Sequence, residues 1–323
     1  MAPLDPPTRE SLLAFLDEQL GREPVTPGTL YIVGTPIGNL GDLTPRALTI
    51  LATCTRVAAE DTRRSGQLLH LLGLRKPLIS YHEHNRASRG PELVQALRDG
   101  ESIALVSDAG MPGISDPGEE LVALCRAADL PVVVIPGPSA AVAALAISGL
   151  PSEQFVFRGF LPSHGKSRKD ALRGLQAAVT LAQTQGGTCS FILYEAPHRL
   201  LKTLEDLVET GLGASPAAIL RELTKRHEDY HAGTVEALLA PRGEIVLILA
   251  PAASAARPAD ANAVDSEQWW NGEIDARLAV GARPSAIVRE LLELPRPAGV
   301  SALTRNELYA RVMDRRDRRP TSL

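Results

Sequence analysis

The sequence predicts an α/β protein built from two α/β domains, followed by a small helical module at the C-terminal end. From residue 30 onward, short runs rich in Val, Ile, Leu and Ala alternate with stretches in which apolar residues recur at helical spacing. This alternation is typical of βα units around a parallel sheet. Several apolar runs lead directly into loops rich in Gly, Pro and Asp, and open α/β sheets bind ligands at that edge.

The first domain is predicted for residues 29–137. Thr44 followed by Pro45 predicts a helix start, because Thr caps helix N-termini and Pro is favoured at the first helical position. Asp116 followed by Pro117 predicts another helix start by the same rule. The strands expected in this domain lie at 30–33, 56–59, 78–81, 102–106 and 132–135.

The second α/β domain is predicted for residues 138–251. Beyond it, residues 252–263 are rich in Ala and Pro with little periodicity, which indicates a linker. Residues 264–323 contain no convincing strand and predict the helical module, whereas residues 1–28 form an N-terminal extension. The elements expected in the second domain are strands at 155–159, 190–194, 218–221 and 245–249 and helices at 168–183 and 199–209.

Composition limits the possible functions. The chain of 323 residues carries a net charge of −4, which excludes the overall basic charge of a generic nucleic-acid binder. Any RNA site must therefore be a local patch. Cys54, Cys125 and Cys189 lack CxxC spacing, so neither a disulfide framework nor a zinc site is expected, and a reducing cytoplasm is the expected location.

Residues 132–150 carry no charge and are long enough to suggest a membrane span. Pro136-Gly137-Pro138 divides this run into a short strand and a short helix, so we expect buried core instead. The first 28 residues show no basic segment followed by an apolar core, and no signal peptide is expected.

Loops rich in Gly and Pro follow the first, fourth and fifth predicted strands, at residues 33–40, 107–118 and 136–141. Gly permits positive φ and close backbone approach, and Pro removes freedom, so these loops combine tight turns with rigidity. The first of these loops matches neither a P-loop nor the G-x-G-x-x-G fingerprint. We expect the loops to converge on one cleft that presents backbone amides to a ligand, although tight helix packing explains the same spacing.

Several segments resemble those of the tetrapyrrole-methylase superfamily and, within it, the family of ribosomal RNA small subunit methyltransferases I. The resemblance covers residues 30–250 in order. Superfamily-like segments are Thr35-Pro36-Ile37-Gly38-Asn39-Leu40, Ala59-Glu60-Asp61-Thr62-Arg63, Ser107-Asp108-Ala109-Gly110, Asp116-Pro117-Gly118 and Pro136-Gly137-Pro138. The narrower family is indicated by Gly159-Phe160-Leu161-Pro162, Tyr194-Glu195, His198-Arg199-Leu200 and Arg221-Glu222-Leu223-Thr224-Lys225.

This resemblance implies a homodimer that binds S-adenosyl-L-methionine between its two α/β domains. It implies methylation of the ribose 2′-hydroxyl of a cytidine in the decoding region of small-subunit (16S) ribosomal RNA, free or assembled. A methylase of corrinoid or porphyrin precursors and a non-catalytic RNA-binding protein of ribosome assembly are the alternatives. The chain departs from the family pattern at Gly34, where Pro is common, and at Met111, where Thr is usual.

The cofactor carries a sulfonium and an amino acid group, so an apolar cleft with backbone acceptors and one carboxylate suits it. Asp108 is the candidate carboxylate, and its alternative role is to cap the glycine turn beside it. The residues expected at the cofactor are Pro36, Gly38, Asp108, Gly110, Pro138, Ser139, Ala140, Tyr194, Arg221 and Glu244.

A 2′-hydroxyl is a poor nucleophile, so transfer needs in-line positioning, which can supply about 7–11 kcal/mol, and a base where one is available. Glu60, His84 and Lys225 are the candidate catalytic residues. They are chosen from a wider polar set that also contains Asp61, His82, Asn85, Glu195 and Arg221. His82 and His84 would point the same way if the third strand continued, but no third ligand has matching spacing, so no metal site is expected.

RNA contact is expected from local positive charge. Residues 158–173 have a net charge of +4, from five basic side chains against Asp170, although such runs are usually solvated faces. The arginines at 305, 311, 315, 316, 318 and 319 make the tail basic, and Asn306-Glu307-Leu308-Tyr309 is similar to the family's helix-turn-helix-like tail. The residues expected to contact RNA are Arg63, Arg64, Arg86, Lys166, Arg168, Lys169 and Arg199.

Overall fold

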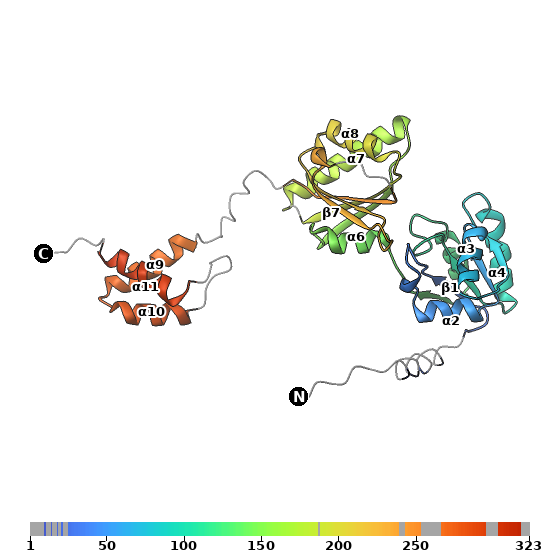
Figure 1. Ribbon diagram of the computed structural model, residues 1–323, viewed down its shortest axis with the longest axis horizontal. Helices are drawn as coiled ribbons and strands as arrows, with labels where there is room; N and C mark the ends of the chain where they lie inside the picture. The colour runs from blue at the N-terminus through green and yellow to red at the C-terminus, as the bar shows by residue number, and fades with distance from the viewer. Residues whose placement is uncertain are drawn as a thin grey trace. The chain divides into compact units, whose positions relative to one another are not determined.

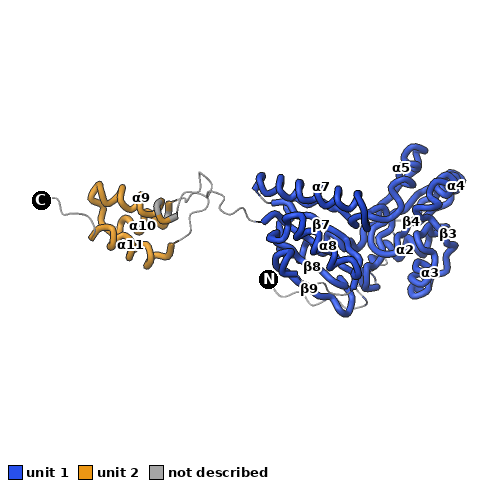
Figure 2. The backbone as a smooth tube through the Cα atoms, turned by 90° about the horizontal axis from the view of Figure 1, so that it is seen from above, with its two compact units in different colours: residues 1–252 blue, residues 253–323 orange. Residues whose placement is uncertain are grey.

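The computed structural model describes residues 25–186, 188–238, 243–252, 266–294 and 303–317, with single positions at 10, 14, 18 and 21. The chain divides into two compact units, residues 1–252 and 253–323 (Figure 2). The first unit contains two five-stranded sheets, and the second is helical. The predicted linker lies outside the described residues except for Ala252, as does most of the predicted extension at 1–28.

The first sheet is parallel throughout and has the strand order β3-β2-β4-β1-β5. Its strands are β1 (Leu30–Val33), β2 (Arg56–Ala59), β3 (Leu78–Ser80), β4 (Ile103–Val106) and β5 (Val132–Ile135). Its helices are α2 (Pro45–Thr53), α3 (Thr62–Leu71), α4 (Arg86–Arg98) and α5 (Glu119–Ala127), with a 3-10 turn at Leu40–Asp42. Alternate residues of the strands pack into two separate apolar clusters, so both faces of the sheet are buried, as expected for βα units.

The helix start predicted at Thr44 is confirmed, because its side chain accepts a hydrogen bond from the Ala47 amide at 3.2 Å. The start predicted at Asp116 is wrong. Helix α5 begins at Glu119, and its N-cap is Gly118, whose φ of 156° falls in a region that favours glycine. This turn separates Asp116 from the helix and leaves its side chain available for another role.

The second sheet is mixed, with the order β6-β7-β10-β8-β9, and only β6 and β7 run parallel. Its strands are β6 (Gln154–Phe160), β7 (Cys189–Glu195), β8 (Pro216–Arg221), β9 (Asp229–Thr234) and β10 (Ile245–Leu249). Strand β9 was not predicted, because Asp-Tyr-His-Ala-Gly-Thr is a largely exposed edge strand without apolar alternation. Antiparallel pairing of β8, β9 and β10 needs only loops between the strands, whereas a parallel sheet would need a crossover helix each time.

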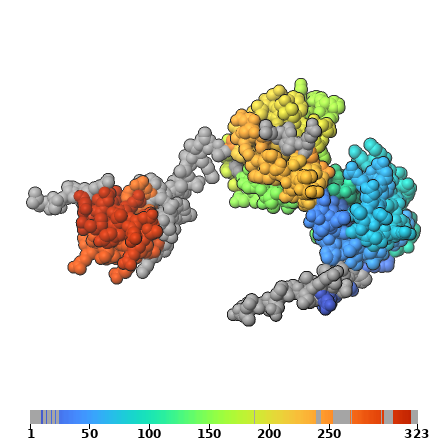
Figure 3. Space-filling view, viewed as in Figure 1, coloured from blue at the N-terminus to red at the C-terminus, as the bar shows by residue number. Residues whose placement is uncertain are grey.

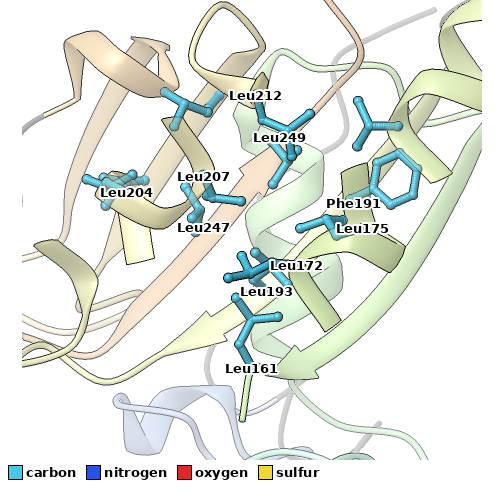
Figure 4. Packing of buried hydrophobic residues seen from close by; sticks show 14 of the residues in the cluster. Leu161, Leu172, Leu175, Phe191, Leu193, Leu204, Leu207, Leu212, Leu247 and Leu249 are labelled. Atoms are coloured by element: carbon cyan, nitrogen blue, oxygen red, sulfur yellow. The ribbon is translucent and has the colours of Figure 1, made fainter. Parts of the chain in front are cut away.

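Helices cover both faces of the second sheet (Figure 1). Helix α6 (Ala140–Ser148) packs on one face through Ala144 and Leu145. Helices α7 (Gly165–Thr184) and α8 (Leu200–Leu207) pack on the other, where a leucine-rich cluster fills the space around Phe191 (Figure 4). A π-helical turn at Val208–Leu212 and a 3-10 turn at Val235–Ala237 complete this layer.

The uncharged run 132–150 is divided by its prolines into β5 and α6, as predicted. The expectation that it would be buried core is wrong in part, because Val133, Val134, Val142 and Ile147 are all at least one third exposed. Strand β5 lies at the edge of its sheet, so one side of it has no neighbouring strand. None of the helices within the described ranges combines the length and apolar character that crossing a membrane requires.

Within its described residues, the second unit contains α9 (Ser266–Ala279), α10 (Pro284–Glu293) and α11 (Arg305–Asp317), which confirms the predicted helical module. Figure 3 shows this unit in a space-filling view, coloured orange to red. Trp270, Ile287 and Leu308 are buried at its centre, one from each helix. Thr304 and Glu307 form a reciprocal capping box, in which the Glu307 carboxylate accepts from the Thr304 amide at 2.8 Å. Residues 295–302 lie outside the described residues, as do Arg318 and Arg319.

Candidate functional site

A cavity of about 350 Å³ opens in the first unit, between loops of the first sheet and strands of the second. From the first sheet it is lined by residues of the loops after β1, β4 and β5. From the second sheet it is lined by the ends of β6, β7, β8 and β10. The lining residues are Ile37, Asp108, Ala109, Gly110, Met111, Ile114, Ser115, Asp116, Ser139, Ala140, Phe160, Tyr194, Glu195, Ala196, Pro197, Leu220, Leu223, Glu244, Ile245 and Val246.

The three loops of the first sheet meet backbone against backbone, which confirms their predicted convergence. Thr35 and Gly110 exchange hydrogen bonds, with N···O distances of 2.9 and 3.1 Å. Gly34 lies against Gly137: a Cβ atom on Gly34 would lie only 2.6 Å from the Cα atom of Gly137. The same Cβ would lie 2.7 Å from the sulfur of Met111, so the two departures from the family pattern are neighbours. Glycine at position 34 makes room for the Met111 side chain.

Aromatic and aliphatic side chains form the opposite wall. The Tyr194 hydroxyl accepts a hydrogen bond from the Ala141 amide at 3.2 Å, which ties β7 to the first turn of α6. The rings of Phe157 and Phe160 pack edge-on against Tyr194, with centroids 5.0 and 5.6 Å away. Leu220 adds an aliphatic surface from β8. This wall can hold a flat apolar group and exclude water from it.

Asp108 is placed in the cavity wall, but its carboxylate is already engaged. One oxygen accepts from the Asp61 amide at 3.2 Å, and the other lies 3.2 Å from the Arg64 guanidinium. These contacts join the loop after β4 to the loop after β2. Asp61 in turn caps α3 and pairs with Arg63, whose hydrogen bonds hold the pKa of Asp61 well below its usual range.

Lys225, a candidate catalytic residue, lies behind the cavity wall. Its ammonium group is 2.9 Å from Glu244 and 3.4 Å from Glu222. Burial lowers the pKa of Lys225, but its bonds to these carboxylates outweigh that effect and hold the pKa above its ordinary value. Its stem packs against the first loop, because a Cβ on Gly38 would lie 2.5 Å from Cγ of Lys225. A lysine that stays protonated is suited to joining these loops rather than to accepting a proton.

Glu60 and His84, the other two candidates, do not line the cavity within the described residues. Burial, Asp116 and Asp108 raise the pKa of Glu60. His84 is exposed in a turn, because β3 ends at Ser80. The strand therefore does not continue through His82 and His84, which was the condition for the two side chains to point the same way. In the described part of the chain, no group of three or more His, Cys, Asp or Glu side chains is arranged to hold a metal ion.

Asn85 has a structural role in that turn. Its side chain accepts a hydrogen bond from the His82 amide at 2.8 Å and donates one to the Ser80 carbonyl at 3.1 Å.

Of the ten residues predicted to contact the cofactor, six line the cavity. The other four, Pro36, Gly38, Pro138 and Arg221, lie outside the lining. Arg221 contacts Asp229 on β9, at 3.6 Å.

Comparison with known proteins agrees with the fold. The model of the Tetrapyrrole (Corrin/Porphyrin) Methylases family matches residues 29–239. A Ribosomal RNA small subunit methyltransferase I from Synechocystis sp. is 47% identical over 289 residues, covering 87% of this chain and 96% of that protein. The protein of the same name from Escherichia coli O157:H7 is 46% identical over 231 residues, covering 69% and 77%.

The chain belongs to the tetrapyrrole methylase family. It is a methyltransferase, and its methyl donor is S-adenosyl-L-methionine. A crystal structure of diphthine synthase shares the fold, with a TM-score of 0.54 and 13% identity over 68% of this chain and 89% of that one.

The residues of the cavity fit this cofactor. The volume of about 350 Å³ lies within the range of small-molecule sites, and the walls are largely apolar. Gly110 has a φ of 87° and packs against Pro138, so its backbone comes close to the cavity without a side chain in the way. Carboxylates at the edge suit a ligand with positive charge.

Several cavity residues were not predicted to be functional. Asp116 was interpreted as a helix cap, and its pKa is raised by burial and by Asp108 despite an opposing contribution from the Ser107 hydroxyl. Ile114, Ser115 and Phe160 also line the cavity. Only the density of Asp, Gly and Pro in 107–118 marked this loop in the sequence, and it does not say which side chain points inward.

Arg168 was expected to bind RNA, and the structure contradicts this. The side chain is buried, with its guanidinium 2.7 Å from Asp206, 2.9 Å from the Thr203 hydroxyl and 3.0 Å from the Pro162 carbonyl. An arginine whose donors are all directed inward holds the start of α7 onto α8. Lys169, the next residue, is exposed.

Arg199 is likewise used internally. It lies 3.2 Å from the fully buried carboxylate of Glu195 and donates to the backbone carbonyl groups of Leu161 and Pro162. Glu195 also accepts from the Thr203 hydroxyl at 2.6 Å and from the Ala196 amide at 2.8 Å. This network fixes the loop after β7, which forms one edge of the cavity.

The remaining predicted RNA contacts lie on the surface. Arg63 and Arg64 are exposed and pair with Asp61 and Asp108. Arg86 lies 3.2 Å from Glu120, which links α4 to α5. Lys166 is exposed near the start of α7.

Replacement of Arg168 by Ala is expected to reduce the free energy of unfolding by about 2 kcal/mol, because the largely buried carboxylate of Asp206 loses its closest cation and retains the exposed Lys202 at 2.9 Å. Lys169→Ala is the matched control and should change stability by less than about 0.5 kcal/mol. Urea unfolding followed by circular dichroism measures both. Equal stability of the two variants would contradict the structural role of Arg168.

Proposed function

We propose that the chain methylates the 2′-hydroxyl of a cytidine in the decoding region of small-subunit (16S) ribosomal RNA, in the cytoplasm. The observation that carries the proposal is 47% identity across 87% of the chain to a Ribosomal RNA small subunit methyltransferase I. The cavity supports it, because its apolar walls and immobilised loops suit a reaction that depends on positioning.

S-adenosyl-L-methionine supplies an activated methyl group when it is bound. We assign its binding to the loops around Asp108, Gly110 and Ser139, with Tyr194 and Leu220 from the opposite wall. The chain itself contributes rigidity and water exclusion. Positioning a hydroxyl group in line with the methyl carbon can contribute about 7–11 kcal/mol to the lowering of the barrier.

Mapping of 2′-O-methyl groups in small-subunit ribosomal RNA from a strain that lacks the protein tests this function. The decoding-region cytidine should be unmethylated in that strain and methylated again when the gene is returned. A methyl group that persists there without the protein would refute the proposal. Methyl transfer by the purified protein to a corrinoid or porphyrin precursor, and not to small ribosomal subunits, would favour the alternative enzyme.

We propose that exposed basic side chains around the start of α7 contact RNA phosphates. Arg158, Lys166 and Lys169 are exposed there, and no ion pair engages them within the described residues. Arg168 is not one of these exposed side chains, because its guanidinium is buried. The patch lies on the segments that bracket the loop from Leu161 to His164, and Leu161 is fixed by Arg199.

The double variant Lys166→Ala, Lys169→Ala should bind RNA more weakly. The logarithm of its binding constant should also fall less steeply with the logarithm of the salt concentration. The magnitude of this slope should decrease by about 1 to 2, because each phosphate contact contributes about 0.9 to it. Affinity for S-adenosyl-L-methionine should not change. Arg75→Ala, which removes an exposed cation before β3, is the control. Fluorescence anisotropy at several salt concentrations measures the slope, and an unchanged slope in the double variant would reject the patch.

We further propose that the protein is a homodimer. Exposed apolar side chains lie on three consecutive elements, β5, α6 and β6, and include Val134 (55% exposed), Val142 (55%) and Phe155 (47%). Strands β5 and β6 are edge strands of their sheets. Exposed apolar surface of this kind marks association sites, and a second copy of the chain is the simplest occupant.

Light scattering coupled to gel filtration should show twice the mass of the single chain. Val134→Asp combined with Phe155→Asp should shift the protein to the monomer, because the association would bury both charges. Leu181→Asp on α7, where Leu181 is 58% exposed, is the control and should leave the dimer intact. A wild-type protein that elutes as a monomer would exclude this arrangement.

A further inference from the structure

Among the described residues, four carboxylate side chains line the cavity, those of Asp108, Asp116, Glu195 and Glu244. We propose that Asp116 is the base that accepts the proton of the attacking ribose hydroxyl. The assignment rests on the proposed function, since it presumes that a hydroxyl group is methylated.

The other three carboxylates are each engaged by partners. Asp108 is held by Arg64 and by a backbone amide. Glu195 is held by Arg199, a hydroxyl and an amide. Glu244 is paired with Lys225 at 2.9 Å. Each of these carboxylates would have to give up a cation or a hydrogen bond in order to accept a proton.

Asp116 differs from them. Within the described part of the chain no cation pairs with it, and the neighbouring group that favours its charged form is the neutral hydroxyl of Ser107. It is partly buried in the wall of the cavity. A carboxylate that lines a cavity without a paired cation is placed to receive a proton from a bound hydroxyl.

The backbone holds Asp116 rigidly. Ser115, the residue before it, has a φ of 63°, a conformation that is costly for a residue with a side chain. Its hydroxyl oxygen packs against Gly159, because a Cβ there would lie 3.0 Å from it. Gly159 sits where the pairing of β6 with β7 shifts register, and its own φ is 61°. Pro117 on the other side restricts the chain further.

The charges around Asp116 suit a base. Asp108 and Glu60 both disfavour the ionised state of Asp116, because each of them can carry a negative charge, and the Arg64 guanidinium pairs with Asp108. Together with burial, Asp108 raises the pKa of Asp116 above its ordinary value. A carboxylate whose pKa lies closer to neutrality is the better proton acceptor at neutral pH.

The proposed step is balanced. The ribose oxygen forms a bond to the methyl carbon, the electron pair of the broken carbon–sulfur bond stays on sulfur, and the hydroxyl proton moves to Asp116. The sulfonium charge is thereby cancelled, and the protonated carboxyl group later loses its proton to water.

Asp116→Asn keeps the size of the side chain and removes its basicity. It should lower the single-turnover rate of methyl transfer to small ribosomal subunits by about 10²- to 10⁴-fold, while the dissociation constant of S-adenosyl-L-methionine, measured by calorimetry, changes by less than about threefold. Glu119 is an exposed carboxylate in the first turn of α5, so Glu119→Gln serves as the control and should keep the wild-type rate. The wild-type rate should rise with pH through an inflection that Asp116→Asn lacks.

A second measurement does not depend on activity. Because the pKa of Asp116 in the folded state lies above its ordinary value, its protonation favours the folded state at low pH, and this stability is lost as pH rises through the folded-state pKa. The melting temperature of Asp116→Asn relative to wild type should therefore increase as pH rises from about 4 towards neutrality, and Glu119→Gln should show no such trend.

Three results would overturn the assignment. They are a methylation rate for Asp116→Asn within about fivefold of wild type, a parallel loss of cofactor affinity that accounts for the slower rate, or a pH-independent difference in melting temperature. If the wild-type protein methylates no ribosomal subunit, the proposed function itself fails, which is distinct from a failure confined to the variant.

Discussion

The contact between glycine-containing loops at the carboxyl edge of the first sheet is the constraint on which the site depends. Gly34 and Gly137 approach so closely that neither tolerates a side chain, and Thr35 and Gly110 are joined by paired backbone hydrogen bonds. Because the loops after β1, β4 and β5 are fixed to one another, the cavity wall has a defined shape before any ligand arrives. Preorganisation of this kind is what a reaction driven by positioning requires.

Charged groups reinforce this wall from behind. Asp108 joins the loop after β4 to the loop after β2, Lys225 joins the first loop to the carboxylates of the second sheet, and the Glu195–Arg199 pair fixes the loop after β7. Most ionisable side chains near the cavity are therefore engaged in holding loops together. This leaves Asp116 as the lining carboxylate without a cation among the described residues, and that is why chemistry is assigned to it.

The use of charged side chains to hold loops together also explains which sequence-based expectations failed. Residues such as Arg168 and Arg199 belong to a basic stretch or a family motif, and charge runs usually face solvent. Their guanidinium groups instead satisfy buried carboxylates and carbonyl groups. A linear pattern cannot show which member of a charge cluster points inward, because that depends on the angle at which α7 meets α8. Asp116 was misjudged for a related reason, since Gly118 inserts a turn between it and the helix.

The sequence by itself determined the alternation of strands and helices, the break at Pro136 and Pro138, the helical C-terminal unit and the convergence of three loops. These follow from local preferences and from the rule that parallel strands share a carboxyl edge. Only the tertiary structure decided that the second sheet is mixed, that the edge strand β9 completes it, and which polar side chains reach the cavity. Such outcomes depend on contacts between residues far apart in the chain, such as Ser115 with Gly159 and Gly38 with Lys225, which no local pattern encodes.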